Sequence, residues 1–250
     1  MGTELAGRRI LVTGGSSGIG AATARACAAA GARVAVLGRD PERVAAVAGD
    51  VDGVAVTADI TELDGVADAV DGAAHGLGGL DAVVHAAGMM IVGSVADTDP
   101  GRWRDMFAIN VIGLLAVTRA ALPQLRESVA PSVVLVSSMA GRRVPRPDGG
   151  VYAASKAAVH AVGETLRLEL QPQGMRVSTM APGFVRTPIA DRFPEGALRD
   201  FYQSRLTEVG LDPEIVADSI VHILALPPEV TVVEYAVVPT AQQLGQQPLR

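Results

Sequence analysis

Seven short runs of β-branched and aliphatic residues are spaced along the chain, at 8–13, 33–38, 53–58, 80–86, 132–138, 175–181 and 230–238. The runs are continuous more than alternating, which is typical of strands covered on both faces. Ala- and Leu-rich stretches with helical spacing separate them. Asp-Pro pairs at 40–41 and 212–213 predict helix starts, because Asp caps a helix and Pro fits its first turn. The alternation predicts a Rossmann-type α/β fold, a doubly wound parallel seven-stranded sheet with helices on both faces.

Composition limits the domain count and the classes of partner. With 250 residues, 49% of them hydrophobic, we expect a single dinucleotide-binding and catalytic domain over 1–250, with an extended tail at 241–250. A net charge of −6 without a basic cluster argues against binding to nucleic acid or a membrane. The lone cysteine, Cys27, and the absence of metal-ligand spacing predict neither a disulfide nor a metal site. Because no run matches the length of a membrane span and no signal peptide is visible, a cytoplasmic protein is expected.

A glycine-rich turn, TGGSSGIG, joins the first predicted strand to a helix. Gly14, Gly18 and Gly20 permit a tight turn and a close approach to a pyrophosphate, and the N-terminus of the helix offers free N–H groups. A simple turn could use the same residues. The position between strand and helix favours nucleotide binding.

The end of the second predicted strand indicates which nucleotide is bound. Gly38 stands where an acidic residue would bind the ribose 2′-hydroxyl of NAD, and Arg39 follows with a planar fork suited to a 2′-phosphate. We therefore expect NADP(H). Asp40 is the counter-argument, but its place before Pro41 favours a helix N-cap.

The only lysine and the only asparagine of the chain belong to one predicted site. Lys156 follows Tyr152 by one helical turn, so both share a helix face, and an ammonium beside a phenol is expected to lower the pKa of the phenol. Ser138 ends a predicted strand and can donate a hydrogen bond to a carbonyl oxygen. Asn110 lies in a predicted helix interior, where Asn is disfavoured unless it holds something. These residues predict acid–base chemistry at a carbonyl.

The chain resembles the short-chain dehydrogenase/reductase family over essentially its whole length. The resemblance rests on TGGSSGIG, Asn110, the paired serines 137–138, YAASK and PGFVRT. It implies a catalytic tetrad in which Tyr152 is the general acid/base, Ser138 positions the substrate oxygen, Lys156 lowers the pKa of Tyr152 and holds the nicotinamide ribose, and Asn110 supports a proton relay. It also implies a homodimer or homotetramer.

The resemblance also implies which residues contact the cofactor. They are Gly14, Ser16, Ser17, Gly18, Ile19, Gly20, Arg39, Asp59, Ile60, Ala86, Ala87, Gly88, Tyr152, Lys156, Pro182, Gly183, Val185 and Thr187. Two departures stand out. His85 occupies a position where the family often has Asn, and the last strand lacks the common Gly-Gly ending.

The predicted function is an NADPH-dependent oxidoreductase that moves hydride between nicotinamide and a carbonyl or alcohol of a small or secondary-metabolite substrate. Two alternatives remain: a cofactor-dependent epimerase or dehydratase without net redox, and a non-catalytic NADP-binding regulator. The three methionines beside the site (Met89, Met90 and Met139) could line the substrate pocket. Segment 184–206 is a plausible substrate lid.

Overall fold

The structure, a computed structural model, describes residues 4–193 and 195–242 and contains a seven-stranded, fully parallel sheet. The strand order is β3-β2-β1-β4-β5-β6-β7. The predicted fold class is therefore confirmed. The strands are β1 Arg9–Thr13, β2 Arg33–Gly38, β3 Val54–Thr57, β4 Ala82–His85, β5 Ser132–Val136, β6 Arg176–Pro182 and β7 Glu234–Val237. Most of the predicted tail, 243–250, lies outside the described residues.

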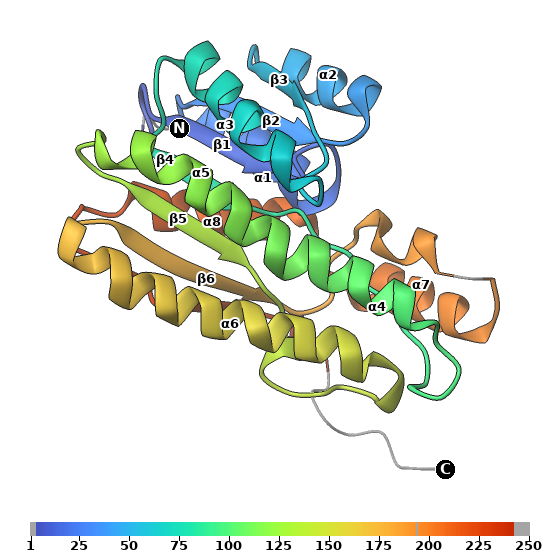
Figure 1. Cartoon of the computed structure of the whole chain (residues 1–250). Helices are drawn as coiled ribbons and strands as arrows, with labels where there is room; N and C mark the ends of the chain where they lie inside the picture. Colours follow the sequence, from blue (N-terminus) through green and yellow to red (C-terminus); the bar gives the residue numbers. More distant parts are fainter. Residues whose placement is uncertain (1–3, 194, 243–250) are drawn as a thin grey trace.

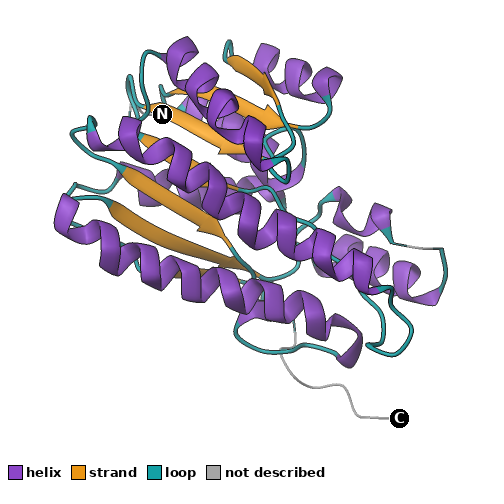
Figure 2. Cartoon of the chain, viewed as in Figure 1, coloured by secondary structure: helices purple, strands orange, loops and turns teal. Residues whose placement is uncertain are grey.

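Helices cover both faces of the sheet (Figures 1 and 2). One face carries α3, α5 and α6, and the other carries α1, α2 and α8, as the two main hydrophobic clusters show. Helix α7 stands apart from both layers, beside the carboxyl ends of the strands. The helices are α1 Gly18–Ala29, α2 Pro41–Asp50, α3 Leu63–Leu77, α4 Pro100–Phe107, α5 Leu114–Arg126, α6 Gly150–Leu170, α7 Ala197–Val209 and α8 Pro213–Ala225.

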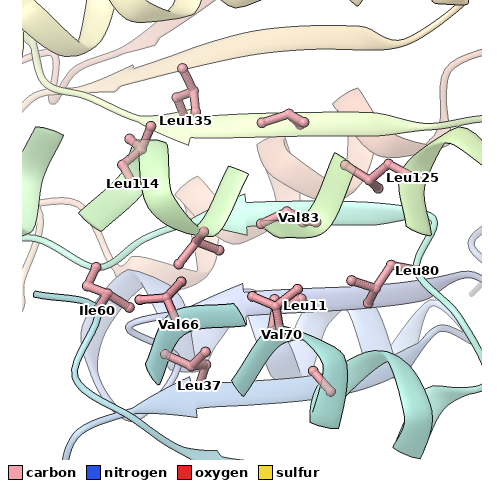
Figure 3. Packing of buried hydrophobic residues seen from close by; sticks show 14 of the residues in the cluster. Leu11, Leu37, Ile60, Val66, Val70, Leu80, Val83, Leu114, Leu125 and Leu135 are labelled. Atoms are coloured by element: carbon pink, nitrogen blue, oxygen red, sulfur yellow. The ribbon is translucent and has the colours of Figure 1, made fainter. Parts of the chain in front are cut away.

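The core follows from the apolar runs of the central strands. Leu11, Val83 and Leu135 point from β1, β4 and β5 toward the α3–α5 layer, where Val70 and Leu125 pack against them (Figure 3). Burying each such side chain contributes about 1.5–3 kcal/mol. The expectation of strands covered on both faces is wrong for β3 and β7, which contain no fully buried residue, because each is an edge strand.

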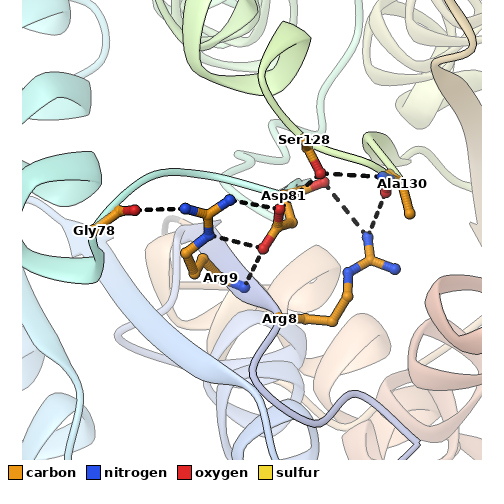
Figure 4. Close-up of polar contacts among 6 residues, drawn as sticks. All are labelled: Arg8, Arg9, Gly78, Asp81, Ser128 and Ala130. Carbon is orange, nitrogen blue, oxygen red and sulfur yellow. Dashed lines mark hydrogen bonds and ion pairs between the residues drawn. The ribbon is translucent and has the colours of Figure 1, made fainter.

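A polar clasp ties the amino ends of the strands together. Arg9 binds the carboxylate of Asp81 through its Nε and one terminal nitrogen, at 2.9 and 2.8 Å, and Ser128 donates to the same carboxylate at 2.6 Å (Figure 4). Arg8 donates to the carbonyl of Ala130 at 2.8 Å. The bonds from Arg9 and Ser128 hold the pKa of Asp81 well below its usual range, although burial opposes this. The clasp fixes the end of the sheet opposite to the one that carries the cavity described below.

The two Asp-Pro pairs both begin helices, but only one aspartate caps its helix. The side chain of Asp40 accepts from the backbone N–H of Arg43 at 3.1 Å, which confirms the predicted N-cap. Asp212 precedes α8 without a capping bond, because its carboxylate is bound by Arg186, with the Nε of Arg186 and Oδ1 of Asp212 3.0 Å apart. The Asp-Pro pattern thus locates a helix start but does not settle which partner the carboxylate takes.

Helix α4, the π-helical segment η1 (Ala108–Gly113) and α5 form one continuous helix over Pro100–Arg126. By length and composition alone it could cross a membrane, so the expectation that no segment reaches this length is wrong. Met106, Val117 and Leu125 of this helix are fully buried inside the protein. A core helix gives the same signal as a span, and the helix is therefore weak evidence for a membrane.

Candidate active site

A cavity of about 1150 Å³ opens at the carboxyl ends of the strands. It lies over the junction of β1 and β4, where the strand order reverses direction, and such a crevice is the usual ligand site of doubly wound sheets. The volume is large enough for a dinucleotide together with a small molecule. The cavity divides into a glycine-rich half near β1 and β2 and a half closed by η5 (Pro188–Arg192) and α7.

The glycine-rich half is built by backbone packing that excludes side chains. Gly14 has φ +65°, and a Cβ on it would lie 2.6 Å from the backbone of Ala87. A Cβ on Gly20 would lie 2.2 Å from the carbonyl oxygen of Gly14. Helix α1 begins directly after this turn, its N-cap Ser17 makes no side-chain capping bond, and its first turn holds no acidic residue. Its N–H groups and positive dipole end are available to an anion at the cavity.

The carboxyl end of β2 forms the adjoining wall. A Cβ at Gly38 would lie 2.9 Å from the Val44 side chain and 3.0 Å from the Ser16 side chain, so a larger residue there would require these side chains to move. Arg39 lines the cavity, is about half exposed, and lies 3.5 Å from the carboxylate of Asp59. Burial opposes the shift, but hydrogen bonds from Thr61 and the charge of Arg39 lower the pKa of Asp59, which stays ionised.

Tyr152 and Ser138 meet at the floor of the cavity. Tyr152 is carried by α6, Ser138 follows β5, and the side chain of Ser138 is close enough to act on the pKa of the phenol. The Ser138 hydroxyl also accepts from the N–H of Ala140 at 3.1 Å, which fixes its position. Burial raises the pKa of Tyr152 to about 12, and Ser138 acts in the opposite direction.

Lys156 is buried, and the lowering of the Tyr152 pKa by Lys156 stays a prediction. The Nζ of Lys156 donates to the carbonyl oxygen of Val136 at 2.9 Å, and burial lowers its own pKa to about 8. Burial is the largest influence on Tyr152 and raises the pKa of its phenol. Lys156 does lie in the same cavity as Tyr152 and Ser138.

Asn110 lies beneath the cavity and does not line it. Its Oδ1 accepts from the N–H of Met89 at 2.8 Å, while its Nδ2 donates to the carbonyl of Met89 at 2.9 Å and to Ser155 at 3.0 Å. The residue sits in the π-helical segment η1, an irregularity that often occurs at functional sites. Asn110 therefore holds the segment after β4 against α6, the helix of Tyr152 and Lys156.

His85, the departure from the family pattern, is buried at the end of β4. Its Nε2 lies 2.9 Å from the hydroxyl of Thr118, which donates its only proton to the carbonyl of Leu114. The Nε2 of His85 must therefore carry the proton of this hydrogen bond. Burial lowers the pKa of His85 to about 3, so the ring is neutral and braces β4 against α5.

Most of the predicted site residues line one cavity. They are Gly14, Ser16, Ser17, Gly18, Ile19, Arg39, Asp59, Ile60, Ala86, Ala87, Gly88, Ser138, Tyr152, Lys156, Pro182, Gly183, Val185 and Thr187, together with Met89, Met90 and Met139. Gly20 and Asn110 stand behind the lining residues. Segment 184–206 supplies η5 and the first part of α7, which form the outer wall.

Sequence reasoning missed one group of cavity residues. Phe201, Tyr202 and Arg205 on α7, Arg143 and Arg146 in the loop after β5, and Gln242 near the end of the described chain all line the cavity. The oxygen of the Gln242 side chain accepts from the N–H of Phe184 at 2.8 Å. The spacing of Tyr202 and Arg205 on one helix face was the available signal for the α7 group.

The residues of the cavity suit a dinucleotide. The uncapped start of α1, the close backbone approach at Gly14 and the Arg39 guanidinium together suit the phosphates and ribose of a dinucleotide. Within 4–193 and 195–242 no group of three or more His, Cys, Asp or Glu side chains could hold a metal ion. Cys27 is buried, and burial raises its pKa to about 12, so it remains a thiol.

Comparison with known proteins gives a consistent result. The family model for short chain dehydrogenase matches residues 8–197. An uncharacterized oxidoreductase of Staphylococcus saprophyticus is 32% identical over 242 residues, covering 94% of this chain and 99% of the relative. A short chain dehydrogenase from Burkholderia cenocepacia in complex with NADP is 32% identical with a TM-score of 0.83, covering 94% and 98% of the two chains. A 3-ketoacyl-(acyl-carrier-protein) reductase from Brucella melitensis complexed with NADH is 29% identical with a TM-score of 0.83 and the same coverage.

Proposed function

The chain belongs to the short chain dehydrogenase family, and from this we propose that it is an NADPH-dependent reductase of a small carbonyl compound, working also in reverse on the alcohol. The observation that carries the proposal is the junction of Tyr152, Ser138 and Lys156 in the same cavity as the uncapped start of α1. Bound nicotinamide would supply the hydride.

The residues at the base of the cavity are suited to the proton transfer that accompanies reduction of a carbonyl. The raised pKa of Tyr152 keeps its phenol protonated at neutral pH, so it can donate the proton that the substrate oxygen needs as hydride reaches the carbonyl carbon. Ser138 is placed to donate a second hydrogen bond to that oxygen. Once the proton has left, the Lys156 ammonium stabilises the phenolate. In the overall reaction, one carbonyl compound, one NADPH and one proton are converted to one alcohol and one NADP⁺.

The choice of NADP(H) over NAD(H) rests on the wall beside β2. Gly38 supplies no carboxylate to bind a ribose 2′-hydroxyl, and Arg39 offers N–H donors at the cavity. Asp40, the alternative ligand for NAD, caps α2. The Burkholderia relative is complexed with NADP and the Brucella relative with NADH, so relatives of this fold bind either cofactor. We assign the preference of this chain to Arg39.

The test is nicotinamide oxidation with NADPH and with NADH across aldehydes, ketones and keto acids. We expect Tyr152→Phe to lower kcat by at least about 100-fold, while Tyr235→Phe, the same change outside the cavity, leaves it unchanged. We expect Arg39→Gln to reduce the preference for NADPH by about 10- to 100-fold through loss of charged hydrogen bonds. Arg25→Gln is the matched control, because Arg25 pairs with Asp50 away from the cavity.

Other outcomes would favour the alternatives. Substrate conversion without net NADPH oxidation would indicate an epimerase or dehydratase. Tight NADPH binding without turnover, together with no effect of Tyr152→Phe, would indicate a regulator. A preference for NADH in the wild type would contradict the role of Arg39. We further propose a cytoplasmic homodimer or homotetramer, as the family resemblance implies.

A further inference from the structure

Tyr202 carries a hydroxyl that the fold does not use. The side chain is 3% exposed, and its ring packs edge-on against Phe193 and Phe201 with centroids 5.4 Å apart in both pairs. A phenylalanine ring would supply the same packing. The hydroxyl oxygen is buried without a hydrogen-bond partner in the part of the chain that the structure describes. Of the six described side-chain atoms that are buried without a partner, this hydroxyl is the one that belongs to a residue of the candidate active-site cavity, so a ligand in the cavity could supply its partner.

The hydroxyl belongs to the same space as the reacting groups. Tyr202 lines the cavity that Tyr152 and Lys156 line. Met90 packs against both the cluster of Tyr202 and the cluster of Tyr152, and so connects the two. Burial, followed by the charge of Asp148, raises the pKa of Tyr202, so its hydroxyl is a proton donor at neutral pH.

Arg205 stands three residues after Tyr202 and therefore on the same face of α7. It lines the cavity, and its Cζ lies 5.7 Å from the centroid of the Phe201 ring. Among the described residues it makes no ion pair and no hydrogen bond. Tyr202, with a neutral O–H donor, and Arg205, with cationic N–H donors, thus both line the cavity from one helix.

The charges around Tyr202 and Arg205 favour an anion. Arg143 and Arg146 approach from the loop after β5, and Arg146 stacks over Phe201 at 4.4 Å. The carboxylates nearby are Asp148, which pairs with Arg146 at 3.1 Å, and the exposed Asp191. With Arg205, three guanidinium groups face two carboxylates, in a chain whose net charge is −6. Local positive charge in an acidic protein attracts and orients an anionic substrate.

We propose that Tyr202 and Arg205 bind a carboxylate of the substrate, so that the enzyme reduces carbonyl compounds carrying an acid group. Arg offers a planar pair of N–H donors and Tyr one O–H donor, which matches the acceptor capacity of two carboxylate oxygens. Met90 and Phe193 would contact the carbon chain between the acid and the carbonyl. The inference rests on the proposed reductase function and specifies its substrate class.

The test compares ω-oxo acids of three to six carbons with their methyl esters, using NADPH and the full chain. We expect wild type to prefer the best acid over its ester in kcat/KM by about 10- to 100-fold, the effect of a hydrogen bond to a charged group. Arg205→Gln should remove this preference by raising KM for the acid, with a smaller effect on KM for the ester. Tyr202→Phe should raise KM for the acid about tenfold while unfolding no more readily than wild type, since it removes only an unpaired hydroxyl.

The matched control is Arg199→Gln, which removes the same charge from α7 at a position that does not line the cavity. Equal use of acid and ester by wild type, or acid kinetics untouched by Arg205→Gln, would overturn the inference although the reductase function would stand. Calorimetric titration of acid and ester into the NADP⁺-loaded protein gives the same comparison without turnover. If neither compound is reduced, acid-specific binding lost in Arg205→Gln supports the site, and its absence rejects it.

Discussion

At the scale of single residues, His85 shows how burial turns a titratable group into a structural one. Its ring is 2% exposed and its pKa is lowered to about 3, against an ordinary value near 6.5. When the pH lies between these two pKa values, His85 binds a proton in the unfolded chain but not in the native chain. Neutral His85 therefore makes its full contribution to the free energy of unfolding above pH 6.5, and this contribution is lost as the pH falls.

We expect wild type to lose up to about 1.4 kcal/mol of unfolding free energy per pH unit below 6.5, relative to His85→Asn. Asn keeps an N–H donor for Thr118 but does not titrate. Urea unfolding at pH 7, 6 and 5 measures the difference, in which the pH dependence of Asp81 and the other carboxylates cancels. Parallel pH curves for the two proteins would show that His85 titrates normally in the native state.

Residues with a local motif could be placed from the sequence, and residues without one could not. Gly14 and Tyr152 stand in short segments whose chemistry is set by near neighbours, and both line the cavity. The role of Tyr202 could not be predicted from the sequence, because it depends on how α7 packs beside the site. Only the structure shows that the hydroxyl of Tyr202 has no partner in the described chain. The direction of the Tyr152 pKa shift also required the structure, since it depends on how deeply the phenol is buried.

At the scale of elements, the C-terminus of α8 depends on a buried arginine from β6. The guanidinium of Arg176 donates to the carbonyls of Ile223, Leu224 and Leu226 at 3.2, 3.1 and 3.0 Å. These carbonyls belong to the last turn of the helix and its exit, where no intrahelical N–H remains for them. The positive charge also complements the dipole of the helix.

We expect Arg176→Met to reduce the unfolding free energy by about 3–5 kcal/mol, because the buried carbonyls lose their donors while the apolar volume is kept. Thermal and urea unfolding measure the loss. Arg167→Met is the control, since Arg167 lies on the surface of α6 and pairs with Glu164. A loss in Arg176→Met no larger than that of the control would contradict the proposed anchoring of α8.

Helices and strands were predictable where a single sequence feature, such as an apolar run or a proline, determined the element. Continuous apolar runs located all seven strands, and the helix of Tyr152 ended close to the predicted Pro172. The π-helical turn at Asn110 was not predictable, because the widened turn is stabilised by bonds to Met89 and Ser155, which are distant in sequence. The position of Asn110 as a brace follows from that tertiary pairing.

At the scale of the whole molecule, the outer surface of the layer formed by the 100–126 helix and α6 keeps three large hydrophobic side chains exposed after folding. Ile112, Leu115 and Leu168 are 47%, 36% and 59% exposed, and the helix over 100–126 lies beside α6 on one face of the sheet (Figure 1). The inner faces of these helices pack on the sheet, so only a second surface could cover the outer ones. We expect a second copy of the chain to cover this face, since two-fold pairs are the commonest assemblies of soluble chains.

We expect the wild type to run as a homodimer or homotetramer in light scattering, and Leu115→Arg to lower the mass because a charge would be buried at the interface without a partner. Val129→Arg is the control, since Val129 is 97% exposed and lies in the loop that follows α5. A monomeric wild type, or a mass unchanged by Leu115→Arg, would contradict the assignment of this face. The helices concerned carry Asn110 and Tyr152. We therefore also expect the specific activity of Leu115→Arg to fall in proportion to its mean molar mass at each protein concentration tested.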